Sequence, residues 1–285
     1  MPLLDADPIY SIQRTGLRVR RPMRLTSASI ALPQHWQHRV DLLRGLVARD
    51  VKVRYKGSVL GIAWGLVTPL AQLLVFVFLF RRVVDLKIPH YPSYVFSGVL
   101  AWGWTQSSLY GAATSLMDGR GLIRRPGFPP AVLPAATVMT NLIHYVLALP
   151  ILLLFMLYDG VSLNASACLL PVLLGIQFAL TLSLCYLISI SQVAFRDTQQ
   201  LLSLGLMLGF YLTPIFYDVS QVPAKFLPFY QLNPLAHLID AHRAILLRGE
   251  VPVASLLGLA ATAGVLLLIS YRVFLRASHR LAEEL

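Results

Sequence analysis

The chain has 285 residues, of which 56% are hydrophobic and 13% charged, and its formal net charge is +11. A soluble domain of this length cannot bury so much apolar surface, so the composition excludes an ordinary soluble protein and indicates one whose solvent is lipid. The basic residues follow juxtamembrane segments and are not interleaved with a stacking platform, which favours anionic lipid headgroups over nucleic acid as their partner.

Stretches without charged residues predict where the chain crosses the membrane. Six of them are long enough for a helix of about 20 residues. The predicted spans cover residues 59–80, 93–116, 131–157, 167–190, 199–217 and 252–271. A seventh apolar region, 219–239, contains Lys225 and three prolines, so we expect two short re-entrant segments there that dip into the surface without crossing. The expected fold class is an all-α integral membrane protein with six transmembrane helices in a domain of residues 57–275.

The distribution of Lys and Arg predicts the orientation, because loops rich in these residues stay on the cytoplasmic side. With both termini inside, 18 of the 24 basic residues lie in cytoplasmic segments. We therefore expect a multi-pass protein with both termini in the cytoplasm, the C-terminal one formed by residues 276–285.

The first 56 residues divide into two parts. Residues 1–33 lack sustained periodicity and predict a mobile cytoplasmic tail. From 34 to 56, apolar residues recur at three- or four-residue steps, which predicts an amphipathic helix in the headgroup layer, either an ordinary anchor or a part of the channel mouth. The residues expected to hold it at the interface are Trp36, Arg49, Lys52, Arg54 and Lys56.

Small residues repeat at four-residue spacing in the first and fifth predicted spans. This spacing places them on one helix face and lets a second helix approach closely. The pattern indicates packing within one subunit or a contact between subunits, and its members are Gly57, Gly61, Gly65, Gly205 and Gly209.

Two loops have unusual sequences. The segment DGRGLIRRPGFPP, residues 118–130, has room for barely two helical turns before its prolines, and it is either a bare connection or a small helix that docks on a soluble partner. The external segment 213–249 is rich in proline and aromatic residues, which is typical of an interfacial aromatic belt or of a lid over an emerging substrate.

The sequence carries no motif of an enzyme active site: we find no phosphate-binding loop, no zinc-protease pattern and no nucleophile elbow. We therefore predict no catalytic residue, no metal site and no ATP hydrolysis by this chain alone. The six spans contain no Asp or Glu, which argues against ion-coupled transport, and we interpret His144 as a partner in helix–helix hydrogen bonding.

Aromatic residues are frequent in the predicted spans. Aromatic faces stack on sugar rings, although packing against lipid or protein is the default for such residues. The candidates for lining a channel are Trp64, Phe76, Trp102, Trp104, Tyr110, Phe210 and Tyr211.

Four motifs carry a resemblance to a known family. RDVKVRYKGSVLGIAWGLVTPL (49–70) resembles the start of the membrane subunit of ABC-2 type polysaccharide exporters. GLIRRPGFPP (121–130) is similar to that family's cytoplasmic coupling segment, AFRDTQQLL (194–202) to its loop before the fifth span, and TPIFYDVSQVP with LNPLAHLIDAHRAIL (213–223 and 232–246) to its external gate. The resemblance covers about residues 34–275.

The resemblance implies a homodimer joined to two copies of a separate ATPase, which would hold ATP and Mg²⁺, with no cofactor on this chain. The cargo would be a lipid-linked polysaccharide, such as O antigen, capsule or teichoic acid, exported across the bacterial inner membrane through a channel between the subunits. The implied coupling residues are Gly121, Leu122, Ile123, Arg124, Arg125, Pro126 and Phe128, and the implied external gate consists of Pro214, Phe216, Tyr217, Pro223, Asn233, Pro234 and Arg243.

Two alternatives remain open. An ABC-2 exporter of small hydrophobic compounds would share this architecture. A membrane-embedded glycosyl or acyl transferase would need polar catalytic residues at the membrane face, where the sequence offers few.

Overall fold

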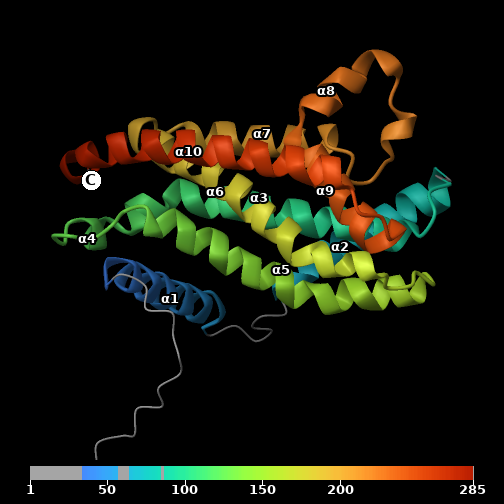
Figure 1. The fold of residues 1–285 in the computed structure, drawn as a ribbon, viewed down its shortest axis with the longest axis horizontal. Coiled ribbons are helices and arrows are strands. Elements are labelled where there is room, and N and C mark those ends of the chain that lie inside the picture. The colour runs from blue at the N-terminus through green and yellow to red at the C-terminus, as the bar shows by residue number, and fades with distance from the viewer. Residues whose placement is uncertain (1–33, 57–63, 85–86, 285) are drawn as a thin grey trace, which may run out of the picture.

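The computed structural model describes residues 34–56, 64–84 and 87–284, and every regular element within them is a helix (Figure 1). The all-helical prediction is confirmed for this part of the chain, whereas the predicted tail 1–33, Gly57 and Gly61 lie outside it. The α-helices are α1 (Gln34–Tyr55), α2 (Trp64–Phe76), α3 (Tyr91–Asp118), α4 (Arg120–Ile123), α5 (Val132–Tyr158), α6 (Leu170–Ala194), α7 (Thr198–Leu212), α8 (Leu227–Leu232), α9 (Pro234–Arg243) and α10 (Val253–Glu284). The π-helices η2 (Val77–Val83) and η6 (Ala244–Arg248) and the 3₁₀-helices η3 (Ala165–Leu169), η4 (Val219–Gln221) and η5 (Ala224–Phe226) complete the set.

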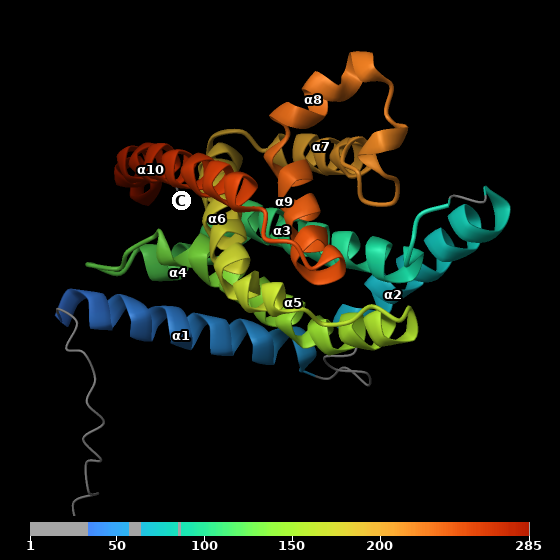
Figure 2. The ribbon, with the colours of Figure 1, turned by 45° about the vertical axis from the view of Figure 1, so that its right-hand side comes forward.

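Helix α3 is the centre of the fold. It packs against α5 and α6, and α10 packs along α6 (Figures 1 and 2). Every residue from Tyr91 to Trp102 is buried. Further along α3, Gly111 lets the Thr137 side chain of α5 approach closely. A buried amide also joins two helices: Gln177 on α6 donates to the Ala101 carbonyl of α3 at 2.8 Å and to Thr105 Oγ1 at 3.2 Å.

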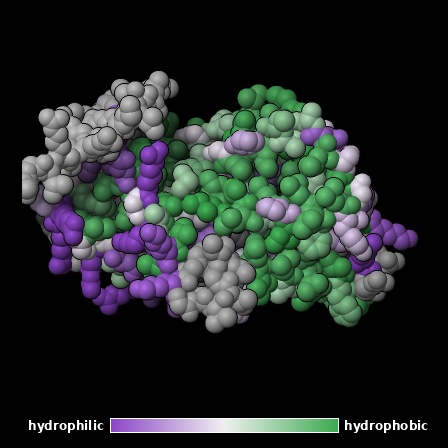
Figure 3. Space-filling model, turned by 90° about the horizontal axis from the view of Figure 1, so that it is seen from below, coloured by the Kyte–Doolittle hydropathy of each residue, from purple (hydrophilic) through white to green (hydrophobic). Residues whose placement is uncertain are grey.

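The bundle has the hydrophobic surface of a membrane protein. Four helical segments are long and apolar enough to cross a membrane: Trp64–Arg81, Val132–Tyr158, Ala165–Ala194 and Val253–Ser278. Figure 3 shows hydrophobic side chains over the middle of one face, with hydrophilic ones gathered mainly at the end where α1 and α4 lie. The prediction of an integral membrane protein is confirmed, and the four segments coincide with the first, third, fourth and sixth predicted spans.

The helices that coincide with the second and fifth predicted spans, α3 and α7, are not both long and apolar enough to belong to this set. Helix α3 is long enough, but it is rich in serine, threonine and glycine. Helix α7 has only 15 residues and ends at Leu212, five residues before the expected end of the span at residue 217. The reason is Pro214: proline forces the preceding residue out of the helical region, and Thr213 is extended (φ −93°, ψ 138°).

Two other segments differ from the expectation. Helix α10 continues to Glu284, so residues 276–284 prolong the last helix. Helix α1 runs alongside α5 in both ribbon views and buries Leu46 and Val47 (Figures 1 and 2). Its location in a headgroup layer stays a prediction.

The two ends of the bundle differ. Helix α4 and the C-terminal end of α10 lie at one end, here called the α4 end, and α8 and α9 lie towards the other, the α9 end (Figures 1 and 2). At the α9 end, the turn between η6 and α10 depends on Gly249, which has φ +70°. The Ser166 hydroxyl supports the same region by donating to the Ile245 carbonyl at 2.8 Å.

Replacing Gly249 by alanine is expected to lower the thermal unfolding midpoint of the purified protein in detergent. A residue with a Cβ pays about 1–2 kcal/mol in the left-handed region, and this Cβ would overlap the Asn164 side chain. Gly175→Ala on α6 is the control, because a Cβ there meets nothing within 4 Å and alanine favours a helix. Equal midpoints for the two variants would contradict the role given to Gly249.

Candidate functional site

The segment predicted to couple to a partner forms one helical turn, α4, and not two. It starts directly after Gly119, where a Cβ would overlap Leu133, so glycine allows the chain to turn sharply between α3 and α5. Ile123 is buried, and Leu122 and Phe128 pack partly buried against the core. The remaining predicted coupling residues, Gly121, Arg124, Arg125 and Pro126, are exposed, as is Arg120.

Arg54 differs from the other predicted interface residues of α1. Lys52, Arg54 and Lys56 are all exposed, and Arg49 pairs with Asp50 at 2.9 Å. The Nη1 atom of Arg54 instead lies 3.2 Å from Asn141 Oδ1 and 2.9 Å from His144 Nδ1, both on α5. The interpretation of His144 as a helix–helix hydrogen-bonding residue is confirmed, but its partner was not foreseen. Trp36 belongs to the first turn of α1.

Ring contacts gather part of the predicted channel aromatics at the α9 end. Phe76 and Phe216 stack at 5.3 Å between ring centroids, and Phe210 lies 5.9 Å from Phe76 and 6.0 Å from Trp102. We call this set, extended by Phe80, Tyr211 and Tyr217, the aromatic cluster.

The other three predicted aromatics lie outside the aromatic cluster. Trp64 is exposed at the start of α2. Trp104 is buried and donates to the Val138 carbonyl of α5 at 3.2 Å. Tyr110 donates to Ser203 Oγ at 3.2 Å and so joins α3 to α7.

The glycines of α7 have different surroundings. A Cβ at Gly209 would lie 3.0 Å from the indole of Trp102, so this glycine lets α7 pack against α3. A Cβ at Gly205 would meet nothing within 4 Å. Gly65 is exposed near the start of α2.

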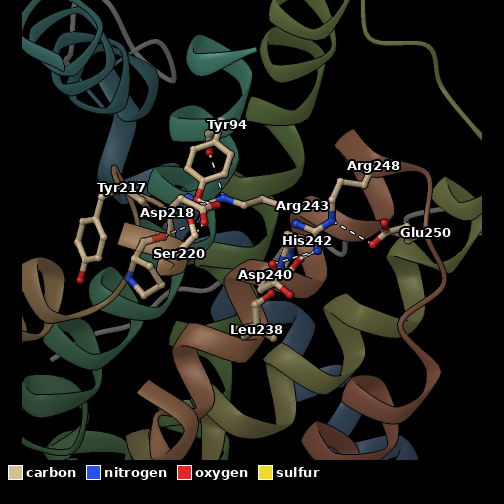
Figure 4. A network of polar contacts seen from close by, with 11 residues as sticks. Tyr94, Tyr217, Asp218, Ser220, Leu238, Asp240, His242, Arg243, Arg248 and Glu250 are labelled. Carbon is tan, nitrogen blue, oxygen red and sulfur yellow. Dashed lines mark hydrogen bonds and ion pairs between the residues drawn. The ribbon is translucent and has the colours of Figure 1, made fainter. Parts of the chain in front are cut away.

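A buried arginine organises the predicted external gate (Figure 4). Arg243 of α9 is only 2% exposed and donates from Nη1 to the Pro214 carbonyl at 2.7 Å and from Nη2 to the Ile215 carbonyl at 2.6 Å. On α3 it reaches the Tyr94 hydroxyl at 2.8 Å, and its guanidinium lies 3.5 Å from the centre of the Tyr94 ring. A Cβ at Gly98 would lie 3.0 Å from Nη2, so glycine keeps this approach open. Arg243 thus joins α9, the chain after α7 and the start of α3.

The Tyr94 hydroxyl lies between the guanidinium of Arg243 and the carboxylate of Asp218. The Tyr94 hydroxyl lies 3.3 Å from Asp218 Oδ2. Burial alone would raise the pKa of the Asp218 carboxyl, but hydrogen bonds from Ser220 and Tyr94 and the charge of Arg243 lower it overall. Burial lowers the pKa of Arg243 to about 10, which leaves the guanidinium charged at neutral pH.

The remaining gate residues support the same loop. Asn233 caps α9 by accepting from the Leu235 amide at 3.0 Å and donates to Thr213 Oγ1 at 3.1 Å. Pro234 is the first residue of α9, and Pro223 is exposed. The Tyr217 hydroxyl lies 2.7 Å from the Tyr230 hydroxyl. Tyr94, which sequence reasoning missed, carries no local signal because it lies far from Arg243 along the chain.

The contacts of Arg243 hold α9, the start of α3 and the chain after α7 together. Among the described residues of this region, no group is arranged for covalent catalysis. In the described part of the chain, no three His, Cys, Asp or Glu side chains come together to hold a metal ion. The geometry comprises an exposed basic turn at the α4 end, a buried arginine at the α9 end, and α3 between them.

Comparisons with known proteins agree with the resemblance that the sequence motifs indicated. The family model described as ABC-2 type transporter matches residues 41–247. The O-antigen export system permease protein RfbA of Myxococcus xanthus is 37% identical over 254 residues, which are 88% of this chain and 97% of the relative. A protein of the same name from Klebsiella pneumoniae is 30% identical over 258 residues, 90% of this chain and 100% of the relative. The polysialic acid transport protein KpsM of Escherichia coli is 22% identical over 220 residues, 73% of this chain and 82% of the relative.

The family model covers most of the chain, and the RfbA proteins align along nearly their whole length. The resemblance found in the sequence motifs is confirmed. The chain belongs to the ABC-2 type transporter family, within its group of polysaccharide-export permeases.

Proposed function

We propose that this chain is the membrane subunit of an ATP-driven exporter that moves lipid-linked polysaccharide out of the cytoplasm across the bacterial inner membrane. The observation that carries the proposal is the end-to-end similarity to permeases named for O-antigen export. Those relatives are permease proteins, which fits a chain that leaves ATP and Mg²⁺ to a separate partner. The names of the relatives also favour a polymer over a small hydrophobic compound, and nothing in the site favours a transferase.

In this proposal α2 with η2, α3, α5, α6, α7 and α10 cross the membrane, and the α4 end faces the cytoplasm. Helix α3 has 28 residues, which at 1.5 Å per residue reach about 42 Å. Helix α7 reaches about 22 Å by the same rise, and the chain beyond it continues to the gate loop. Both termini are then cytoplasmic, as the distribution of basic residues predicts.

A homodimer would explain why α2 and α7 are exposed over almost their whole length in the single chain. Leu73 is the buried residue of α2 and Leu206 that of α7, whereas α3 is buried over most of its length. Exposed apolar residues follow α7 on successive turns, at Leu201, Leu204, Leu208 and Leu212. We propose that α2 and α7 of two subunits face each other around the channel, with the aromatic cluster near its outer mouth, where rings stack on passing sugars.

Coupling would run through α4. Closure of two ATPase subunits around ATP would move α4 as a rigid turn, since Ile123 and Phe128 attach it to the bundle. The movement would then pass along the buried α3 to Tyr94 and Arg243 at the outer end.

Replacing Arg124 and Arg125 together by glutamate should abolish co-purification of the ATPase and lower cell-surface polysaccharide by about tenfold or more, because reversed charges oppose docking. The fold should be retained, since α4 is attached through apolar side chains. Arg272→Glu with Arg276→Glu is the control: both arginines are exposed near the C-terminal end of α10. Normal export by the Arg124/Arg125 variant would refute the docking role of α4.

The subunit arrangement is testable by cysteine cross-linking in membranes. In a background with Cys168 and Cys185 replaced, single cysteines at exposed α7 positions should form disulfide-linked dimers at Leu204 or Leu208, because a two-fold axis brings identical residues together. The control position is Leu154 on α5, which is 64% exposed. Cross-linking at Leu154 alone would place the subunit interface elsewhere.

A further inference from the structure

A polar cleft runs into the bundle from the α4 end, and none of the functions above uses it. A cavity of about 560 Å³ lies between α1, α3 and α5, and one of about 380 Å³ lies between α2, α3 and α5. Arg54 and Asn141 line both cavities, so the two adjoin at Arg54; we call them together the cleft, with an outer and an inner part.

Arg54 is exposed in the single chain, yet it contacts α5 well inside the length of that helix. Its partners Asn141 and His144 lie nine and twelve residues after the first residue of α5, which is about 14 and 18 Å along a helix of about 40 Å. A charge at this depth in a membrane is costly and marks a functional path more often than a structural one.

The inner part of the cleft carries a positive charge that it does not neutralise. Its lining includes Arg54 and no carboxylate, whereas Asp50 and Asp118 line the outer part. No ion pair among the described residues involves Arg54, and Asp50 pairs with Arg49. Both contacts of Arg54 to α5 use Nη1 and neutral acceptors, so His144 accepts at Nδ1.

Further polar groups face the same space. Gln72 and Gln106 line the inner part. Thr140 lines the outer part and Tyr145 the inner part, and the hydroxyls of both are buried without a hydrogen-bond partner among the described residues. Both hydroxyls are shielded from the cleft, so the further polar side chains that a ligand there could reach are those of Gln72 and Gln106.

We infer that this cleft binds the phosphate group of a lipid headgroup, held by Arg54 and oriented by Asn141, about a third of the way along α5 from its α4 end. A guanidinium presents a planar fork of donors that matches phosphate oxygens, and its charge offsets the loss of hydration that a phosphate suffers at this depth. The inference deepens the proposed function: a lipid-linked cargo must carry its phosphate across the apolar layer, and the cleft is a station on that path. An ordinary phospholipid shares this chemistry.

Binding is measured with the purified full-length chain in neutral detergent, by native mass spectrometry over a concentration series. Three probes are compared: farnesyl pyrophosphate, a short-chain phosphatidylglycerol and inorganic pyrophosphate. Arg54→Gln removes the charge, and Asn141→Asp supplies Arg54 with a carboxylate of nearly the same shape. Arg44→Gln is the control, because Arg44 is exposed on the same helix and lines neither part of the cleft.

We expect both Arg54→Gln and Asn141→Asp to weaken binding of the phosphate-bearing lipid by about tenfold, since a charge-assisted hydrogen bond contributes that much. Arg54→Lys should recover part of the affinity and Arg44→Gln should leave it unchanged. Tighter binding of farnesyl pyrophosphate identifies the site with the cargo, and tighter binding of phosphatidylglycerol identifies it with a membrane lipid.

Equal affinity of the unaltered chain and Arg54→Gln would overturn the inference, and so would an equal loss in Arg44→Gln. Inorganic pyrophosphate binding as tightly as the lipids would also overturn it, because the site would then take a free anion. Because binding is measured without transport, a chain that exports no polysaccharide but binds through Arg54 refutes only the proposed function.

Discussion

The close packing of α3 between α5 and α6 is the constraint on which the rest of this structure depends. An apolar bundle in lipid gains little from the hydrophobic effect between helices, so close contact and buried hydrogen bonds must hold it together. Gly111 of α3 lets the Thr137 side chain of α5 approach closely, and Gln177 of α6 provides hydrogen bonds. Because α4 follows one end of α3 and Tyr94 lies near the other, this one packed helix joins the two ends of the bundle.

The polar interactions have a consistent distribution. At the α9 end Arg243 is enclosed by carbonyl groups and an aromatic ring, which gives a buried charge the partners it requires. In the middle of the bundle Arg54 has only neutral partners from α5 and an adjoining cavity. The contacts of Arg243 satisfy its charge and are typical of a structural role, whereas the surroundings of Arg54 leave room for a ligand.

The sequence predicted the fold class and most of the helices because uncharged stretches and prolines are local signals. The early end of α7 was also readable from Pro214, yet the uncharged stretch concealed it. The contacts of the sites were not predictable: Arg243 meets Tyr94 across 149 positions, and Arg54 meets His144 across 90. Neither pair has a motif, because tertiary packing alone brings the residues together. Tertiary packing also decides which aromatic residues of the predicted spans come together in the aromatic cluster, and the sequence does not show this.

The short length of α7 has a consequence for the surrounding bilayer. A helix of 15 residues covers about 22 Å, and the hydrocarbon layer of a membrane is about 30 Å thick. Lipids next to α7 of a lone subunit would therefore have to compress by several ångströms, at a cost that grows with each ångström of mismatch. The mismatch would thus favour a dimer in which the partner subunit, and not lipid, covers this helix.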